Sequence, residues 1–371
     1  MYDVCVASGA TYPASTWSFT GYGSEVVSWW LARELASRGL RVLLIACMQT
    51  ERIPNVTLAP VPCTYGVVDN LTEFTALKLF MKDVKQCKVI HDMSNSGVFH
   101  AYSHVIDGRS IITRNGYLPP LFNTRNTVVL SSAVKEYFKE RYGLNPEVVH
   151  YGLPISEYPF SDRKGDYVLY VGRPHPSKGV DLIIKLAKMF PEENFVLAWN
   201  PTAIDHFHYA RHYQQLAEKM RVKNVHFLRL PSGWRGEWAK RVLMSRAKLF
   251  IQPTIYLEAF GLTAIEALAT GTPVLLSTAG SGPEIVTNSE VGVLVRNSLS
   301  LIEQAEEWQN KILDAIDLDE LANAFEDALK RKWNYLAIRK YVEERFSIKA
   351  MTDKYLNFYK EVMEGEWWGD V

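Results

Sequence analysis

Two glutamates, Glu258 and Glu266, are separated by seven residues where a loop leads into a predicted helix. The pattern predicts that this helix begins near Gly261 and Leu262 and ends near Thr270, so its free N–H groups and positive dipole end lie between the two acids. A phosphate group fits at such a helix start. Eight residues at about 1.5 Å rise span roughly 12 Å, with both side chains broadly on one side of the axis. The spacing therefore predicts a site for a sugar, a diphosphate and a ribose in one ligand.

Two cations, Arg173 and Lys178, lie five residues apart on a loop bounded by glycine and proline. The loop follows a predicted strand and precedes a predicted helix, so both cations can converge on one pair of phosphates. Their charge would stabilise a leaving diphosphate in place of a metal ion. The alternative interpretation is a surface loop with two solvated charges.

A Gly-x-Gly turn, Gly21 and Gly23, precedes a predicted helix from Val26 to Arg38 that ends at Gly39. Two glycines at a helix start allow backbone N–H groups to approach a ligand closely. The same pair is also compatible with a simple tight turn.

Bulk properties indicate a cytoplasmic enzyme. The chain has 371 residues, which suits two domains, and 41 basic residues balance 41 acidic ones, which argues against a nucleic-acid partner. No stretch is long and apolar enough to span a membrane, and no leader sequence is apparent. The four cysteines lack the spacing of a zinc site, so the sequence predicts buried free thiols at Cys5, Cys47, Cys63 and Cys87.

Short β-branched runs alternate with amphipathic segments, which is typical of parallel sheets covered on both faces. The pattern predicts an α/β protein with two doubly wound domains, residues 1–155 and 156–345, joined by a Pro- and Gly-rich linker at 152–166. A final helix is expected at 348–362 and a frayed tail at 365–371. The predicted strands are 2–7, 41–46, 88–91, 110–113, 127–130 and 147–149, then 167–171, 195–199, 225–228, 249–252, 273–276 and 292–295.

Residues 253–284 resemble the glutamate-seven-residues-glutamate motif of retaining family 4 glycosyltransferases of the GT-B fold, also called glycosyl transferases group 1. The likeness includes Gly-Thr-Pro-Val at 271–274 and a glycine-rich turn at 280–284. Residues 172–179 resemble the family motif Gly-Arg-x-x-x-x-Lys-Gly. The resemblance implies two Rossmann-like domains facing a cleft, with the acceptor on the first and the nucleotide-sugar donor on the second. It also implies that the segment 346–371 crosses back to the first domain.

The resemblance assigns roles to individual residues. It implies that Glu258 hydrogen-bonds the donor sugar, that Glu266 binds the ribose hydroxyls, and that Arg173 and Lys178 hold the diphosphate. The glycine turn would lie near the phosphates and the transferred sugar. The backbone of four residues would complete the anion site: Ala259, Phe260, Gly261 and Leu262.

The implied reaction is transfer of a hexose from a nucleotide-diphosphate sugar, most commonly a UDP-sugar, to an acceptor hydroxyl. It needs no cofactor and no metal, and the leaving phosphate oxygen accepts the acceptor's proton, so that no protein nucleophile is required. Acceptors in the family include glycans, small sugars, lipids and proteins. The segment Phe74–Lys88 is basic and amphipathic, which suits either peripheral contact with a membrane or a crossover helix on the sheet.

The sequence departs from the family pattern at Asn115, where many members carry a histidine near the transferred sugar. Asparagine still donates and accepts hydrogen bonds, so Asn115 is retained as a candidate catalytic residue. A second departure is Trp199, which stands where a glycine-rich turn is common and either alters the nucleotide pocket or packs. His91 is either a core or a functional residue. Two alternatives therefore stay open: a nucleotide-sugar sensor without transfer, and a sugar-nucleotide 2-epimerase of the same fold.

Overall fold

The computed structural model of the protein describes residues 1–15, 23–65, 70–120, 123–200, 204–312 and 315–368. The chain divides into two compact units. The first contains Met1–Pro154 together with Phe346–Val371, and the second contains Ile155–Arg345. Each unit has its own parallel sheet and its own buried core.

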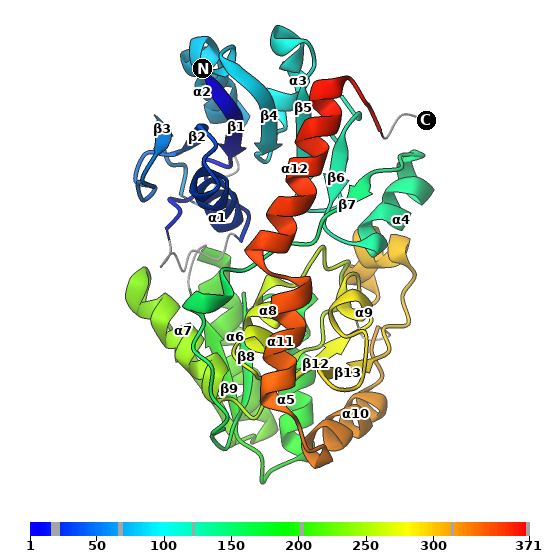
Figure 1. Ribbon diagram of the computed structural model, residues 1–371. Helices are drawn as coiled ribbons and strands as arrows, with labels where there is room; N and C mark the ends of the chain where they lie inside the picture. Colours follow the sequence, from blue (N-terminus) through cyan, green and yellow to red (C-terminus); the bar gives the residue numbers. More distant parts are fainter. Residues whose placement is uncertain (16–22, 66–69, 121–122, 201–203, 313–314, 369–371) are drawn as a thin grey trace. The chain divides into compact units, whose positions relative to one another are not determined.

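The first unit is built on a parallel sheet with the order β3-β2-β1-β4-β5-β6-β7. Helices α1 and α12 contact each other on one face, and α2 and α3 cover the other (Figure 1). Chain order reverses between β1 and β4, and ligands of doubly wound sheets bind at the carboxyl ends of the strands beside such a point. The elements are β1 Tyr2–Ser8, α1 Gly23–Ser37, β2 Val42–Cys47, β3 Val56–Val61, α2 Asn70–Val84, β4 Cys87–Met93, α3 Val98–Ala101, β5 Ser110–Arg114, β6 Thr127–Val129, α4 Ser132–Tyr142, β7 Glu147–Val148 and α12 Ile348–Glu364.

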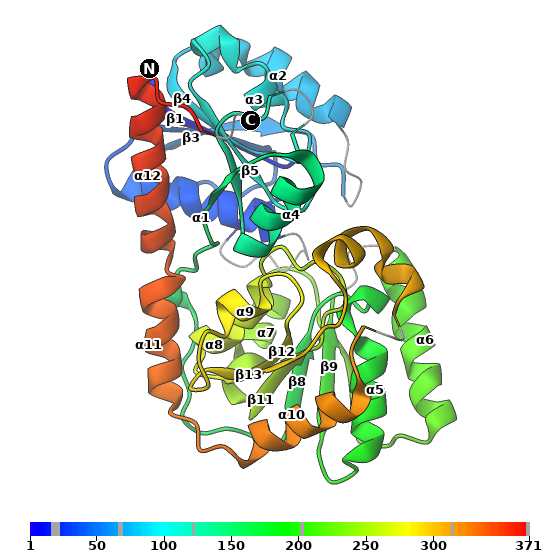
Figure 2. The ribbon, with the colours of Figure 1, turned by 90° about the vertical axis from the view of Figure 1, so that its right-hand side faces the viewer.

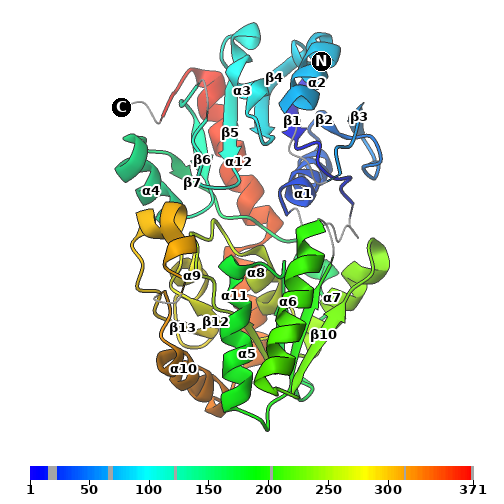
Figure 3. The same cartoon turned by 180° about the vertical axis from the view of Figure 1, so that it is seen from behind.

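The second unit is built on a parallel sheet with the order β10-β9-β8-β11-β12-β13. Helices α7, α8 and α11 lie on one face, and α5, α6 and α10 lie on the other (Figures 2 and 3). The elements are β8 Val168–Val171, α5 Val180–Met189, β9 Phe195–Trp199, α6 Ile204–Met220, β10 Val225–Arg229, α7 Trp234–Arg246, β11 Leu249–Gln252, α8 Leu262–Ala269, β12 Val274–Ser277, α9 Gly282–Ile285, β13 Gly292–Val295, α10 Leu318–Lys330 and α11 Tyr335–Arg345. Short helical turns lie at Ile155–Glu157, Pro176–Lys178, Glu303–Glu307 and Trp308–Asn310.

Every strand predicted from the sequence is present, with ends that differ by at most two residues. The predicted doubly wound α/β class is therefore confirmed. The sequence analysis missed β3, which reads Val-Thr-Leu-Ala-Pro-Val and contains Pro60. A proline within a run argues against a central strand, but it is tolerated at a sheet edge, where β3 lies.

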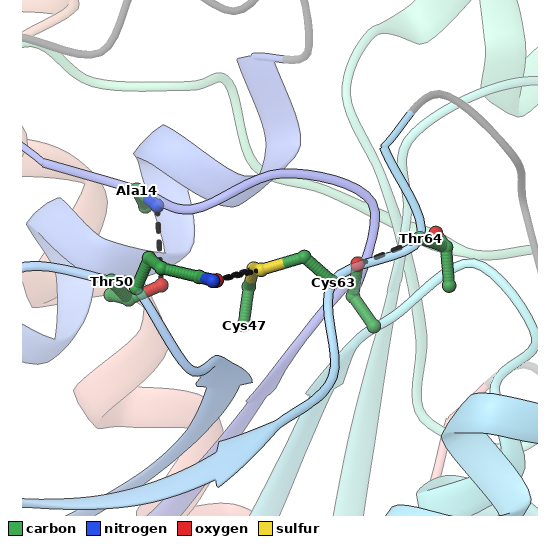
Figure 4. The surroundings of a disulfide bond; sticks show 7 residues. Ala14, Cys47, Thr50, Cys63 and Thr64 are labelled. Carbon is green, nitrogen blue, oxygen red and sulfur yellow. Dashed lines mark hydrogen bonds between the residues drawn. A yellow bond between two sulfur atoms is a disulfide. The ribbon is translucent and has the colours of Figure 1, made fainter.

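The prediction of free thiols is wrong for two of the four cysteines. Cys47, at the end of β2, and Cys63, just after β3, form a disulfide with a Cα–Cα distance of 5.0 Å (Figure 4). The two strands are parallel neighbours in which Cys47 aligns with Val61. Because β3 was not predicted, no local pattern placed the two cysteines together. Cys5 and Cys87 are buried and free, as expected.

The disulfide joins two segments that both hold the loop after β1. The Ala14 N–H donates to Thr50 Oγ1 at 3.2 Å, and Glu51 N donates to Ala14 O at 2.8 Å (Figure 4). On the other side, Thr64 N donates to Ala10 O at 3.0 Å. The disulfide therefore braces the start of the loop after β1, at Ala10 and Ala14, from both sides.

Reduction of this disulfide is expected to lower the free energy of unfolding by about 3 kcal/mol, the entropic effect of opening a closed loop of this length. Denaturant unfolding with and without dithiothreitol measures the difference. The Cys63→Ser variant should match the reduced protein under both conditions. Equal stability of oxidised and reduced wild-type protein would contradict the bracing role.

The predicted frayed tail is ordered as far as Trp368. Asn126 N donates to Trp368 O at 2.9 Å, and Trp368 Nε1 donates to Thr127 O at 3.1 Å. The ring of Trp368 also packs on Phe358 of α12, with ring centroids 4.8 Å apart. The short segment with its glycines reads as an irregular end, but the indole of Trp368 finds a partner on β6.

Helix α2 contains the predicted amphipathic segment from Phe74 to Val84, whereas the segment's last residues, Cys87 and Lys88, lie in β4. Its residues Ala76, Leu77 and Val84 are buried, and the helix contacts β2, β3 and β4. The crossover-helix interpretation accounts for these buried residues, but Leu71, Phe74 and Leu79 of the same helix are exposed, so peripheral membrane contact stays a prediction. Within the described part of the chain, no helix is both long and apolar enough to cross a membrane.

Candidate functional site

Lys178 is placed by a tight turn between β8 and α5. The imidazole of His175 accepts a hydrogen bond from Ser177 N at 3.3 Å and caps the short helical turn Pro176–Lys178. The next residue, Gly179, has a positive φ of 68°. A Cβ atom there would collide with the carbonyl oxygen of Pro253. Glycine therefore lets this loop press against the loop that follows β11.

Glu258 is placed by a second close crossing of backbones. Gly280 has a positive φ of 52°, and a Cβ atom at this position would collide with the backbone of Glu258. Ser281 N donates to Glu258 O at 3.0 Å, and Gly280 N donates to Gln304 Oε1 at 3.0 Å. The glycine-rich turn after β12 thus holds the backbone of Glu258 from one side.

Lys178, Tyr256 and Glu258 form one hydrogen-bonded cluster. The ammonium of Lys178 forms an ion pair with Glu258 Oε2 and donates to the Tyr256 hydroxyl at 3.2 Å. That hydroxyl donates to Glu258 Oε1 at 3.1 Å, and the ammonium lies 4.8 Å from the Tyr256 ring centroid. The Lys178 and Glu258 side chains are only 9% and 14% exposed. A carboxylate and an ammonium are thereby fixed side by side.

The electrostatics keep this pair ionised. Burial disfavours the charge of Glu258, but the adjacent Lys178 ammonium outweighs it and lowers the pKa of Glu258. Burial also disfavours the charge of Lys178, but Glu258 raises the pKa of Lys178. Burial and then Glu258 raise the pKa of Tyr256, so this hydroxyl stays a donor. The cluster therefore holds one positive charge, one negative charge and a hydroxyl donor side by side.

Helix α8 begins beside this cluster. Gly261, with a φ of 66°, is its N-cap, and no side chain caps the helix. The first N–H groups of an uncapped helix have no intrahelical acceptor, so they are available to an anion. Ala259, Phe260 and Leu262 adjoin Gly261 in the chain, and their backbone role in an anion site stays a prediction. A small pocket lies behind it, between Glu258, Gly261 and the turn after β12.

Glu266 lies in α8 but in a different cluster from Glu258. It is 2% exposed, and its Oε1 accepts from Tyr158 Oη at 2.8 Å and from Lys240 Nζ at 2.7 Å. Among the described residues of the second unit, Glu258 and Glu266 share no hydrogen-bond or ion-pair partner. The two acids are thus held separately at either side of the helix start.

Arg173 is exposed on the loop after β8. Its carbonyl oxygen accepts from the Tyr170 hydroxyl at 2.7 Å, which fixes the backbone but not the guanidinium. The positive charge of Arg173 contributes to the lowered pKa of Glu258 after that of Lys178. Arg173 therefore lies within electrostatic reach of the Lys178 and Glu258 pair.

Three predicted site residues belong to the first unit: Gly21, Gly23 and Asn115. Gly23 begins α1, three residues before the expected start, and Gly21 lies outside the described residues. Asn115 follows β5 and is fully engaged: its Nδ2 donates to Met93 O at 2.9 Å, and its Oδ1 accepts from the Tyr151 hydroxyl. The structure thus fixes the orientation of Asn115, and its catalytic role stays a prediction.

His91 and Trp199, whose roles the sequence left open, both pack within the structure. His91 is fully buried, and its ring nitrogens contact the hydroxyls of Tyr359 at 2.7 Å and Thr113 at 2.8 Å. Burial lowers the pKa of His91 to about 3, so the ring is neutral. Trp199 is 7% exposed and packs edge-on against Phe207.

Glu25, in the first turn of α1, is a buried carboxyl group that the sequence analysis did not single out. It is 1% exposed, and its Oε2 accepts from Ser24 Oγ at 2.7 Å. Burial raises the pKa of Glu25 to about 7, against this hydrogen bond, which favours the carboxylate. The folded protein therefore binds a proton at Glu25 that the unfolded chain releases at lower pH.

A raised pKa makes Glu25 a source of stability that is complete below pH 4.5 and is lost as the pH rises through about 7. At about 1.4 kcal/mol per pH unit, the loss is about 3 kcal/mol. Unfolding measured between pH 5 and pH 8 should show this decline in wild-type protein and a flatter profile in Glu25→Gln. The exposed Glu136→Gln on α4 serves as the control. Identical profiles for all three proteins would refute the assignment.

Two residues of the site were missed from the sequence. Tyr256 lies inside the motif, two residues before Glu258, and an aromatic hydroxyl there was a usable signal. Lys240 has no such signal, because it lies in α7, 26 residues from Glu266 in the chain. Only the packing of α7 against α8 brings Lys240 to the glutamate.

Comparison with known proteins agrees with this geometry. Residues 156–332, which include both glutamates and both cations, match the family model described as glycosyl transferases group 1. The O-antigen chain mannosyltransferase RfbU of Salmonella typhimurium is 28% identical over 218 residues, which are 57% of this chain and 55% of that protein. The D-inositol 3-phosphate glycosyltransferase of Mycolicibacterium paratuberculosis is 31% identical over 161 residues, 40% of this chain and 35% of that one. The chain thus spans about half or less of these relatives.

Solved structures show the fold. The Anabaena protein Alr3699/HepE, crystallised with UDP-glucose, superimposes with a TM-score of 0.66 at 16% identity, covering 98% of this chain and 100% of that chain. The two parallel sheets with their helices are those of GT-B glycosyltransferases. The family model matches the segment that holds the Lys178 and Glu258 cluster, and the solved structure shows the same fold.

Proposed function

We propose that the protein is a retaining hexosyltransferase that transfers a sugar from a nucleotide-diphosphate sugar, probed first as a UDP-sugar, to an acceptor hydroxyl without a metal ion. The observation that carries the proposal is the cluster of Lys178, Tyr256 and Glu258 beside the uncapped start of α8. An ammonium and free helix N–H groups suit a diphosphate, and a fixed carboxylate beside them suits sugar hydroxyls.

In the proposed reaction, Lys178 and Arg173 bind the diphosphate and the N–H groups at Gly261 and Leu262 add to the anion site. The bond between the sugar's anomeric carbon and the phosphate oxygen breaks, and the acceptor oxygen bonds to the same face. The released phosphate oxygen takes the acceptor's proton. Negative charge grows on the diphosphate as it leaves, so cations and N–H groups there stabilise the transition state more than the bound donor.

The charge that the site already carries supports a metal-independent mechanism. Lys178 is held within the site and is ionised, which is the role that a bound cation would otherwise fill. In this proposal the diphosphate competes with Glu258 for the ammonium, so Glu258 is released towards the sugar when the donor binds. A carboxylate that exchanges partners in this way links donor binding to sugar recognition.

Relatives and neighbours support the donor class. The Anabaena protein is described in complex with UDP-glucose, and the Salmonella relative is named a mannosyltransferase. Donor base, donor sugar and acceptor are therefore questions for experiment. The roles of Glu266 in ribose binding and of Asn115 near the transferred sugar are part of the same proposal.

Calorimetric titration of the protein without added metal, against UDP, GDP, ADP and their sugar conjugates, tests the proposal. We expect micromolar binding of one base. No binding to any of them by folded protein would refute the proposed donor site. Nuclear magnetic resonance of the product of a transfer assay should show the donor's anomeric configuration; the opposite configuration would refute retention.

Turnover separates the alternatives. Binding without turnover against a panel of acceptors would identify a nucleotide-sugar sensor. Release of nucleoside diphosphate together with an altered free sugar would identify a 2-epimerase.

A further inference from the structure

Four charged side chains are buried together between α7 and α8 in the second unit. They alternate in sign and form a chain of contacts: Arg241 Nε donates to Glu237 Oε1 at 2.7 Å, Lys240 Nζ lies 3.0 Å from Glu237 Oε2, and Lys240 also donates to Glu266. Each is at most 5% exposed. Burying two ion pairs is expensive and seldom adds stability over apolar packing. The cluster therefore invites a functional explanation.

The donors around Glu266 all meet one of its two oxygens. Tyr158 Oη and Lys240 Nζ both donate to Oε1, at 2.8 and 2.7 Å. Oε2 accepts no hydrogen bond from the residues that the structure describes, and 3% of the Glu266 side chain remains exposed. Two donors on one oxygen fix the plane of the carboxylate and leave the other oxygen as an acceptor.

The two donors, Tyr158 and Lys240, are themselves held by neighbouring charged side chains. Arg241 is fully buried, lies 4.4 Å from the Tyr158 ring centroid, and donates to Glu157 O at 2.9 Å. Burial, and then the charge of Glu266, raises the pKa of Tyr158 well above its ordinary value, so its hydroxyl remains a donor. Burial disfavours the charge of Lys240, but Glu237 and Glu266 raise the pKa of Lys240. The donor set is thus constant across the physiological pH range.

We propose that Lys240 is a positioning residue for ribose recognition: with Tyr158 it holds Oε1 of Glu266, so that Oε2 accepts the ribose hydroxyls of the nucleotide. This inference rests on the proposed function, in which Glu266 binds the ribose. Lys240 does not touch the ligand in this arrangement. It acts through Glu266, and Glu237 with Arg241 fixes the ammonium in turn.

The physical reason is pre-organisation. An ionised carboxylate accepts hydroxyl hydrogen bonds strongly, but a freely rotating one loses part of that gain when it is ordered. A carboxylate already held by two donors has no such loss on binding. Supporting residues around a ligand-binding side chain commonly have this effect.

Calorimetric titration of the full chain with UDP and with 2′,3′-dideoxy-UDP tests the proposal, because the two ligands differ only in the ribose hydroxyls. We expect wild-type protein to prefer UDP by about 10- to 100-fold. Lys240→Met combined with Glu237→Gln removes one charge of each sign. This double variant should reduce the preference to less than about threefold, with dideoxy-UDP affinity unchanged.

Tyr158→Phe removes one donor at little steric change and should reduce the preference several-fold. If the double variant does not fold, the preference of Tyr158→Phe for UDP over dideoxy-UDP tests the positioning role instead. Lys164→Met is the matched control, because the Lys164 ammonium is also sequestered in this unit but bonds Ser245 O and Thr272 Oγ1. The control should keep the wild-type preference.

The outcomes are distinguishable. If wild-type protein binds neither ligand, the proposed function fails. If it prefers UDP, and the variants lose affinity for both ligands equally, the cluster supports the fold or the phosphates and the positioning role is overturned. An unchanged preference in the variants overturns it as well.

Discussion

Replacement of Glu258 by glutamine is expected to lower the rate of sugar transfer by about 100- to 1000-fold, while UDP alone binds as tightly as to wild-type protein or more tightly. Glutamine keeps the shape of the side chain but carries no negative charge. The charge of Glu258 is held in place by Lys178 and Tyr256, and the proposal assigns it to the donor sugar. Without that charge, Lys178 is free to attract the diphosphate alone.

Two measurements check this prediction: the rate of transfer at saturating donor, and the dissociation constant of UDP by calorimetry. Glu290→Gln is the matched control, since Glu290 is an exposed glutamate of the same unit. A wild-type rate of transfer in Glu258→Gln would refute the proposed role of the Glu258 charge in the reaction. A parallel loss of UDP affinity would instead indicate a structural role for the carboxylate.

Replacement of Lys178 by methionine is expected to have two large effects. It leaves the Glu258 carboxylate without its ion-pair partner in a site where both side chains are largely buried, which costs about 3 to 5 kcal/mol of stability. It also weakens donor binding by about 1.5 to 3 kcal/mol, the contribution of a charge-assisted hydrogen bond. Denaturant unfolding and calorimetric titration measure the two effects separately.

A second substitution separates pairing from packing. In Lys178→Met with Glu258→Gln, no unpaired charge remains, so most of the lost stability should return while donor binding stays weak. Lys185→Met is the control, because it breaks a more exposed ion pair with Asp181 and should change stability by less than about 1 kcal/mol. Failure of the double variant to recover stability would show that the methylene packing of Lys178, and not its charge, matters.

The sequence by itself predicted every strand but β3 and both charged residues of the cluster, Lys178 and Glu258. Strands are marked by local runs of β-branched residues, and the start of α8 is marked by Gly261 between two acids. These signals lie within a few residues of one another, where local backbone preferences act. Only the family resemblance predicted that Lys178 and Glu258 belong to one site. In the structure both follow the carboxyl ends of neighbouring strands, β8 and β11, where residues of a parallel sheet converge.

Only the tertiary structure decided the contacts between residues that lie far apart in the sequence. It paired Cys47 with Cys63 next to β3, an edge strand that was not predicted because it contains Pro60. It placed Trp368 against β6, where a frayed tail was expected. It also set Lys240 of α7 against Glu266 of α8. Each of these contacts depends on which elements pack side by side, and packing is decided by the burial of whole faces and not by any local pattern.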